Sequence, residues 1–187
     1  MLLRAATAED ASAVAELHVA SWRSAYRDVL SGEYLADAAE GDRQAYWQGR
    51  LSTPHHGQRV DLLVLANQVV GFSCVLVGHD AVLGSFLHNL HIAPALVGRG
   101  LGSVLMGAVR QHCLSTAPQD PVFLWVVSSN QRAQHFYAKL GAAYVGQTQW
   151  QPPGGGSALL YRMGWRTPGE IRAPNNSSKP TPLRGAA

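Results

Sequence analysis

The sequence predicts an α/β protein whose helices pack on one mixed sheet, with the element order β-α-α-β-β-β-α-β-α-β-β. Three observations lead to this prediction. Apolar runs of strand length recur along the chain, and segments with apolar residues at helical spacing separate several of them. A cluster of three glycines within residues 98–102 also lies between a strand-like run and a helical pattern. With 187 residues, 47% of them hydrophobic, the chain has the size of one ordinary domain.

The first half of the chain is expected to contain one short strand, two helical regions and three consecutive strands. Residues 2–6 suit the first strand. Thr7 with Asp10 resembles a capping box at the start of the first helix, whose apolar spacing continues to Ala25. Ser31 can cap the second helical region, which covers residues 30–41 and 42–51. Strands are then expected over residues 60–66, 69–77 and 81–93, with turns between them.

The second half is expected to alternate helices and strands. Residues 101–112 carry the apolar stripe of an amphipathic helix. The run VFLWVV at residues 122–127 is continuously apolar, which is expected for a strand buried on both faces. A helix over residues 131–140 then ends at Gly141, a residue suited to the left-handed position after a helix. Residues 142–150 and 157–165 form a final pair of strands, joined through QPPGGG.

We expect one folded domain over residues 1–166 and a tail over residues 167–187. The segment APNNSSKPTPLRGAA, residues 173–187, has almost no apolar side chains. It cannot bury enough surface to offset the entropy lost on ordering, so we expect this tail to be disordered.

The composition argues against several classes of partner. The chain has 15 basic and 12 acidic residues and no basic stripe, so we expect no nucleic acid as a partner. No apolar segment approaches the ~20 residues of a membrane span, and the opening MLLRAATAED lacks the pattern of a signal peptide, so we expect a cytoplasmic protein. Cys74 and Cys113 suit buried thiols, and neither they nor His55 and His56 have a spacing that indicates a metal site.

The stretch LHIAPALVGRGLG, residues 90–102, indicates an anion site. Backbone N–H groups in the first turn of a helix have no partner, and the helix dipole is positive there. Gly98, Gly100 and Gly102 would let a ligand reach these groups without meeting a Cβ atom. Phosphate is the natural ligand of such a site, and Arg99 could add a charge-assisted contact.

Other interpretations of the glycines are weaker or stay open. A P-loop is rejected because Lys-Ser or Lys-Thr would follow the last glycine, where this chain has Ser103 and Val104. A dinucleotide fingerprint has the spacing G-x-G-x-x-G, whereas this loop has G-x-G-x-G and follows three strands instead of opening a βαβ unit. A tight loop whose glycines serve only close packing stays open as an alternative.

Two motifs together resemble those of the GNAT superfamily of N-acetyltransferases. The first, L-H-I-A-P-x-x-x-G-R-G-L-G-x-x-L over residues 90–105, is similar to the acetyl-CoA motif of that superfamily. The second, VVSSNQRAQHFYAKLGA over residues 126–142, is similar to its later motif. The motifs stand in the expected order, and the resemblance covers residues 2–165. It implies a GNAT-like acyl-CoA N-acyltransferase fold, with acetyl-CoA as co-substrate and no metal.

The resemblance implies a role for each matching position. Backbone groups of Leu90 and Ile92 would contact the pantetheine arm and the acetyl carbonyl. Asn130 would hydrogen-bond that arm. Tyr137 would lie near the thioester sulfur as the acid for the leaving thiolate, although its apolar helix face also fits a core residue. Main-chain N–H groups of the loop would wrap the diphosphate: Val97, Gly98, Arg99, Gly100, Leu101, Gly102 and Ser103.

Proton removal from the amine needs a base, and His88 and His91 are the candidates because histidine titrates near neutral pH. In a regular strand the two would point to opposite faces, and a β-bulge between them would bring them to the same side. Members of the superfamily carry a histidine at the position of His88, on the acceptor side, which favours His88; a structural histidine is the alternative. Phe86 stands where several members carry a catalytic glutamate, so the resemblance supplies no carboxylate base.

The sequence thus predicts an N-acetyltransferase that moves an acetyl group from acetyl-CoA to a primary amine of a small molecule or peptide, by direct attack in a ternary complex. Trp22 and Tyr26 lie about one helical turn apart and could wall the acceptor pocket or belong to the core. A non-catalytic acyl-CoA-binding module is the main alternative, and an NAD-dependent oxidoreductase is a second one. The sequence does not specify the amine, the acyl chain or the oligomeric state, and a homodimer is compatible with it.

Overall fold

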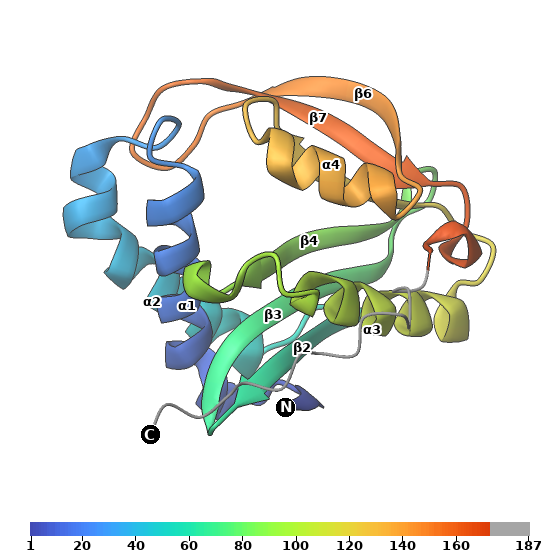
Figure 1. Ribbon diagram of the computed structural model, residues 1–187, viewed down its shortest axis with the longest axis horizontal. Helices are drawn as coiled ribbons and strands as arrows, with labels where there is room; N and C mark the ends of the chain where they lie inside the picture. Colours follow the sequence, from blue (N-terminus) through green and yellow to red (C-terminus); the bar gives the residue numbers. More distant parts are fainter. Residues whose placement is uncertain (173–187) are drawn as a thin grey trace.

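The computed structural model describes residues 1–172 and shows a mixed α/β fold built on one seven-stranded sheet (Figure 1). The chain begins with β1 (Leu2–Ala5), α1 (Ala11–Ala25), α2 (Ala39–Ser52), β2 (Gln58–Leu65), β3 (Gln68–Asp80) and β4 (Gly84–Ile92). It continues with α3 (Leu101–Thr116), β5 (Val122–Val127), α4 (Gln131–Lys139), β6 (Ala143–Trp150) and β7 (Ala158–Trp165). The predicted fold class and element order are confirmed.

The strands lie in the order β1-β2-β3-β4-β5-β7-β6, and every neighbouring pair is antiparallel except β4 and β5. Helices α1 and α2 pack their apolar side chains against β2 and β3 on one face. Helices α3 and α4 cover the other face, where α3 lies across the middle of the sheet and α4 follows β5 (Figure 1). The sheet therefore separates two helical layers.

Strands β4 and β5 pair over only two residues each, and this short pairing shapes the site. Ser85 and Phe86 of β4 lie opposite Val122 and Phe123 of β5. Beyond them the two strands separate, while β5 stays paired with β7 along its whole length. A regular parallel pair would have filled this space with ladder hydrogen bonds. The separation leaves an opening between the carboxyl ends of two central strands.

A β-bulge interrupts β4 just before this opening. Cys74 of β3 lies opposite Asn89, whereas the next β3 residue, Val75, lies opposite Leu87. His88 is therefore the extra residue of the bulge, which lies at His88 itself, and the pairing from Asn89 to Ile92 is regular.

Local signals at the helix starts act largely as the sequence predicts. The backbone N–H and the hydroxyl of Thr7 both donate to the Asp10 carboxylate, at 2.8 and 3.1 Å, and this capping box opens a short 3₁₀ segment that leads into α1. The hydroxyl of Ser31 accepts a hydrogen bond from the backbone N–H of Tyr34 at 3.1 Å. A π-helical turn over Tyr34–Ala38 continues directly into α2, so the two predicted helical segments form one region.

The folded part of the chain reaches residue 172, which corrects the expected domain end at residue 166. Pro168–Glu170 form a 3₁₀ turn, and Ile171 is only 1% exposed because it packs in the α3–α4 core. The backbone N–H of Arg172 donates to the carbonyl of Leu140 at 3.0 Å. The disorder predicted for residues 173–187 lies outside the described residues.

Two further predictions concern the thiols and the membrane. Cys74 and Cys113 are both buried free thiols, as predicted. Within residues 1–172, no helix combines the length and apolar character needed to cross a bilayer. The cytoplasmic location and the oligomeric state stay predictions.

Candidate active site

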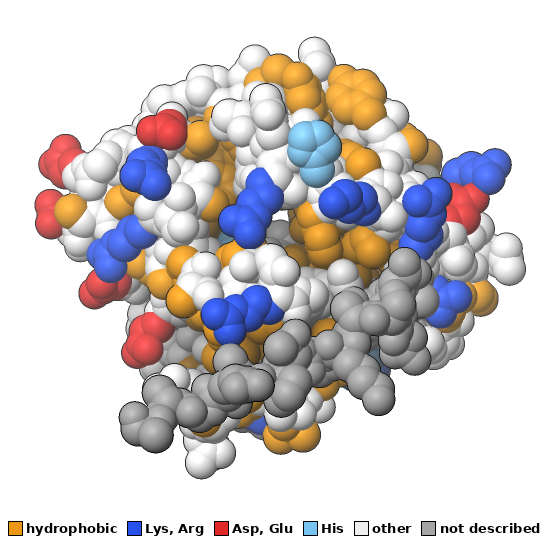
Figure 2. All heavy atoms as spheres, viewed as in Figure 1, with side chains coloured by type: hydrophobic (Ala, Val, Ile, Leu, Met, Phe, Trp, Pro, Cys, Tyr) orange, Lys and Arg blue, Asp and Glu red, His pale blue; other side chains and the backbone are white. Residues whose placement is uncertain are grey.

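A cavity of about 1210 Å³ occupies the opening between β4 and β5. Its walls come from α1, β4, the glycine loop, α3, β5, α4 and β6. Figure 2 shows Lys and Arg side chains around a hollow with hydrophobic side chains in its walls. Each layer of the fold thus contributes to one continuous site, which extends from the glycine loop to the space in front of α1.

The glycine loop enters α3 with its amide groups free. Gly98 and Gly100 have φ angles of +90° and +82°, a left-handed conformation that L side chains rarely adopt. Within the described residues, the N–H groups of residues 98–102 donate no hydrogen bond to a backbone carbonyl outside the helix, and the first loop-to-helix bond is made by Ser103, to Gly100 at 3.0 Å. These free amides lie at the positive end of the α3 dipole and line the cavity, which suits an anion.

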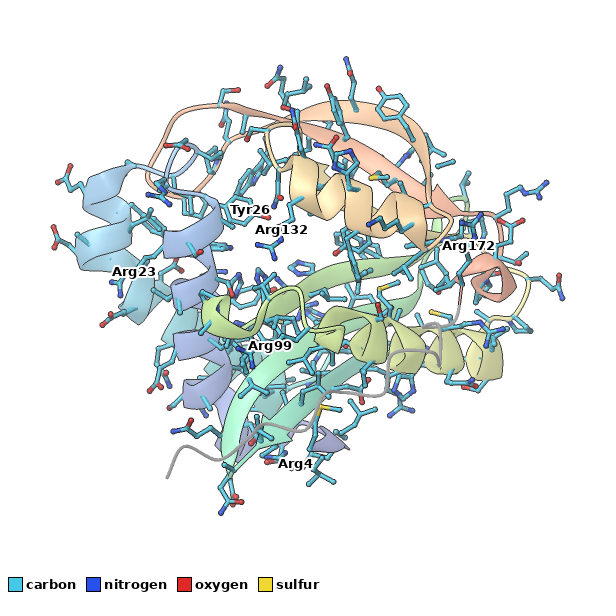
Figure 3. All side chains as sticks on the ribbon, in the orientation of Figure 1. Arg4, Arg23, Tyr26, Arg99, Arg132 and Arg172 are labelled. Carbon is cyan, nitrogen blue, oxygen red and sulfur yellow. The ribbon has the colours of Figure 1, made fainter. Side chains whose placement is uncertain are left out.

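The cation nearest to this loop comes from α4. The guanidinium of Arg132 lies 3.4 Å from the position that a Cβ atom on Gly98 would take, and Arg132 lines the cavity. Arg99 is exposed and does not line it. Figure 3 shows Arg132 between the loop and α4, with Arg99 on the other side of the loop. The charge-assisted contact expected of Arg99 is therefore better placed on Arg132.

The third glycine has a different task. A Cβ atom on Gly102 would lie 3.1 Å from the ring of Phe136. Gly102 thus allows α3 and α4 to approach closely next to the loop, so the close-packing alternative holds for this position. At positions 98 and 100, glycine is required by the left-handed backbone conformation.

A tyrosine pair and an asparagine connect α1 to α4. The Oδ1 atom of Asn130 caps α4 by accepting the backbone N–H of Ala133 at 3.1 Å. Tyr26 lies at the end of α1 facing α4 (Figure 3), and burial raises its pKa against an opposing contribution from Asn130. Burial raises the pKa of Tyr137, and the neighbouring Tyr26 raises it further. Both phenols therefore keep their protons at neutral pH.

The bulge brings His88, Asn89 and His91 into one hydrogen-bonded row. Nδ1 of His88 lies 2.6 Å from Oδ1 of Asn89. The amide nitrogen of Asn89 lies 3.5 Å from Nε2 of His91. Because a carbonyl oxygen only accepts, Nδ1 of His88 carries the proton and Nε2 keeps its lone pair. His88 thus has the tautomer of a base.

The Nε2 atom of His88 faces a second polar chain on α2. The hydroxyl of Tyr46 lies 3.5 Å from this atom and accepts a hydrogen bond from Arg50 at 2.7 Å. Burial lowers the pKa of His88 to about 4, against an opposing contribution from the Asn89 hydrogen bond. Arg50 also lowers it, because a nearby positive charge disfavours the imidazolium. His88 is therefore neutral throughout the physiological range.

His91 and His18 form a tilted ring pair in the cavity wall. Their ring centroids lie 4.5 Å apart. Burial, followed by the neighbouring His88, lowers the pKa of His91 to about 3. The indole N–H of Trp47 donates to Nδ1 of His18 at 3.0 Å, so Nε2 of His18 carries a proton. This Nε2 is buried without a hydrogen-bond partner within the described residues, although His18 lines the cavity.

The structure brings together nearly all the residues that the sequence selects. His88 and Tyr137, the predicted base and acid, line the same cavity, and so do the predicted acceptor walls Trp22 and Tyr26. Of the predicted cofactor residues, Arg99 alone lies outside the lining, which otherwise includes Leu90, Ile92, Val97, Gly98, Gly100, Leu101, Gly102, Ser103 and Asn130.

Sequence reasoning missed several residues of the site. Arg132, Asn89, Trp125 and Trp150 all line the cavity. The position of Arg132 in the first turn of a helix that follows Asn130 was an available signal for an anion ligand. The two tryptophans gave no such signal, because their place depends on how β5 and β6 lie in the sheet. Among residues 1–172, no cluster of three His, Cys, Asp or Glu residues could hold a metal ion.

The comparison with known families decides the class of the protein. The profile of the acetyltransferase (GNAT) family matches residues 12–142, well over half of the chain. The chain belongs to the GNAT acetyltransferase family. As a member of that family, the protein is an acyltransferase.

Solved structures of GNAT proteins agree with this assignment. A GCN5-related N-acetyltransferase from Rhodopseudomonas palustris is 26% identical, with a TM-score of 0.69 over 87% of this chain and 93% of that chain. The PaiA N-acetyltransferase from Thermoplasma acidophilum, solved with coenzyme A, is 16% identical, with a TM-score of 0.66 over 86% and 96%. YncA from Salmonella typhimurium, a putative acetyltransferase solved with acetyl-CoA, is 17% identical, with a TM-score of 0.64 over 89% and 93%. No curated protein matches the sequence.

The opened β4–β5 pair and the glycine loop have features that suit an acyl-CoA ligand. The free loop amides suit a diphosphate, and the unpaired edges of β4 and β5 offer backbone hydrogen bonds to an extended amide-bearing chain. The residues present thus fit acetyl-CoA as the acyl donor of this acyltransferase.

Proposed function

We propose that the protein is an N-acetyltransferase that transfers the acetyl group of acetyl-CoA to a primary amine of a small molecule or peptide, by direct attack in a ternary complex. One observation carries the proposal: the opening between β4 and β5 places the free loop amides, the base-type tautomer of His88 and the protonated Tyr137 along one cavity. Acetyl donor and acceptor can therefore meet without a covalent enzyme intermediate.

The coenzyme would be held mainly by backbone. The amides of residues 98–102 and the guanidinium of Arg132 would bind the diphosphate. The edge of β4 up to Ile92 would hydrogen-bond the pantetheine arm and supply an N–H to the acetyl carbonyl oxygen as it gains charge. Asn130, which caps α4 and lines the cavity, would meet the arm from the opposite side.

The reaction requires a balanced set of transfers. Acetyl-CoA supplies an activated acyl group. The amine nitrogen forms a bond to the acetyl carbon, and the carbon–sulfur bond breaks. The nitrogen loses its proton to Nε2 of His88, and Tyr137 gives its hydroxyl proton to the leaving thiolate. His88 then releases its proton to water and Tyr137 regains one from water, which resets both side chains.

The pKa of His88 limits what this base can do. An alkylammonium has a pKa of about 10, so moving its proton to a histidine with a pKa of about 4 would cost about 8 kcal/mol. This cost is too large for His88 to deprotonate a bound ammonium ion efficiently. The amine would therefore bind as the free base, and His88 would accept the proton only after attack, when the nitrogen has become strongly acidic.

A non-catalytic acyl-CoA-binding module is the second candidate. Phe86 favours it, because this ring lines the cavity beside His88, 5.1 Å between centroids, and the lining within the described residues contains no carboxylate. Steady-state measurement of thiol release with a panel of amines separates the two. Release of CoA that depends on an amine supports the transferase, whereas tight acetyl-CoA binding without amine-dependent release supports the binding module.

A further inference from the structure

The half of the cavity that faces α1 has walls of flat aromatic and imidazole rings. We call this half the acceptor compartment, and its rings belong to Trp22, Phe86, His88, His91, Trp125 and Trp150. The ring of Phe86 stacks on Phe123 at 4.9 Å with 12° between planes, which holds it in place in the cavity wall. Such walls stabilise a bound ring or apolar chain by removing its surface from water.

No negative charge faces this compartment. Among the cavity-lining residues that the structure describes, none is an aspartate or a glutamate. Two carboxylates on adjoining elements are already engaged. Asp42 accepts hydrogen bonds from Tyr34 and Arg43, and Asp80 accepts the backbone N–H groups of residues 82 and 83.

Positive charge, in contrast, surrounds the compartment. The guanidinium of Arg43 lies 4.8 Å over the ring of Trp22, and that of Arg162 lies 5.8 Å over the ring of Trp125. Arg50 reaches toward His88 through Tyr46. Arg43 pairs with Asp42 at 3.1 Å, whereas Arg50 and Arg162 form no ion pair with a carboxylate of residues 1–172 and have buried guanidinium nitrogens without a hydrogen-bond partner there.

We propose that the acceptor is a primary monoamine on an aromatic or apolar skeleton, and that the acceptor compartment discriminates against diamines and polyamines. This inference deepens the proposed function and rests on it. The positive field lowers the pKa of a bound ammonium ion and so favours the free amine, the form that attacks. The second ammonium group of a diamine does not react and so keeps its charge. It would lie among arginines, with no carboxylate to pair with it.

A matched pair of substrates isolates the effect of the second charge. The monoamine para-methylbenzylamine and the diamine para-xylylenediamine share the same ring and the same reacting group, and differ by one distal ammonium. The kcat/KM of the monoamine is expected to be at least ~10-fold higher, after a factor of two for the two equivalent amines of the diamine. Equal values, or a preference for the diamine, would overturn the inference while amine-dependent release of CoA still upholds the transferase.

Variants at Trp150 test the aromatic wall, because this side chain is partly exposed and its loss should leave the fold intact. Trp150→Ala should raise the KM for para-methylbenzylamine about 10-fold with the KM for acetyl-CoA unchanged, and Trp150→Phe should restore most of the loss. An unchanged amine KM in Trp150→Ala would remove this wall from the acceptor compartment and contradict the inference.

A binding measurement keeps the inference separate from the proposed function. If neither these two amines nor the wider amine panel releases CoA, the transferase is overturned, and calorimetric titration of the CoA-saturated protein with both amines then decides. Tighter binding of the monoamine would preserve the assigned ligand class. Equal binding, tighter binding of the diamine, or no binding of either would overturn it.

Discussion

Nδ1 of His88 lies 2.6 Å from the side-chain oxygen of Asn89, its neighbour in the β4 bulge. The bulge makes this contact possible because it turns two consecutive side chains toward the same face. Asn89 therefore fixes the proton on Nδ1 and leaves Nε2 free to accept another. The proposed base owes its tautomer to a side chain that the sequence alone did not single out.

Asn89→Ala should lower kcat by about 10- to 100-fold, because His88 loses the contact that selects its tautomer. Asn89 is a positioning residue, so the effect should depend on His88. In the His88→Ala background, the further loss caused by Asn89→Ala should vanish. Equal losses in both backgrounds would show that Asn89 acts through the fold and not through the base.

The pH dependence of kcat/KM should be set by the pKa of the acceptor amine and not by that of His88. Burial puts the pKa of His88 at about 4, and Arg50, His79 and Arg43 help to keep it low against the Asn89 hydrogen bond. Between pH 6 and 10 the histidine is neutral, so kcat/KM should rise with pH until the amine is deprotonated. The midpoint should shift when an acceptor of lower pKa is used and stay in place in His88→Ala. A midpoint near 6.5 that is lost in His88→Ala would contradict this account.

Tyr137→Phe should lower kcat by roughly 10- to 10³-fold while the Kd of CoA stays unchanged. The hydroxyl stays protonated because burial and Tyr26 raise its pKa, so it can donate a hydrogen bond that stabilises the thiolate as the carbon–sulfur bond breaks. Tyr144→Phe is the matched control, since its exposed hydroxyl contacts only Gln147 on the far strand. A variant Tyr137→Phe with unchanged kcat would remove this tyrosine from the chemistry.

Gly100→Ala should raise the Kd of CoA about 10-fold or more, because alanine resists the φ of +82° that aims the loop amides at the diphosphate. Gly78→Ala provides the control: its φ is +65°, a Cβ atom there would meet open space, and it does not line the cavity. That variant should lose similar stability and keep its CoA affinity. Equal weakening of CoA binding in both variants would point to a general loss of structure.

Stability should fall on acidification between about pH 6.5 and 4. The pKa values of His88 and His91 lie below the value of the unfolded chain, at about 4 and about 3. Below pH 6.5 the unfolded state therefore binds protons that the folded state does not, so the free energy of unfolding decreases as pH falls, and above that window these groups contribute nothing. Urea unfolding at pH 7.0, 5.5 and 4.5 measures the decrease.

His91→Gln removes one of these titrating groups and should make the decrease smaller. Asp10→Asn is the control, because the Arg4 ion pair lowers the pKa of Asp10 to about 2 and its contribution is lost only between about pH 3.8 and 2. That variant should be less stable at all three pH values and show the same decrease as the parent chain. An undiminished decrease in His91→Gln would contradict the assignment to His91.

The sequence predicted most of the fold because its signals are local. The continuous run at residues 122–127 coincides with β5, and the capping pair at Thr7 and Asp10 lies where the first helical turn begins. The predicted end of the domain came too early in the sequence. Ile171 packs in the core beside α3 and α4, and no local sequence pattern indicates this contact.

The parts of the site that the backbone forms could be predicted from the sequence. The parts formed by side chains from distant segments were harder to predict. The glycine loop and the bulge at His88 follow from residue type and strand alternation. The low pKa of His88 does not, because it arises from burial under α2 and from arginines far away in the sequence. Arg99 was selected for its place beside the glycines, but the turn of the loop directs it away and leaves the position to Arg132.

A crystal structure of the protein with coenzyme A tests the central claim most directly, namely that the opening between β4 and β5 is the acyl-CoA site. The account predicts the diphosphate against the amides of residues 98–102, the pantetheine arm between β4 and β5, and the sulfur beside Tyr137. A diphosphate bound elsewhere, or a coenzyme that leaves the opening between the two strands empty, would contradict it.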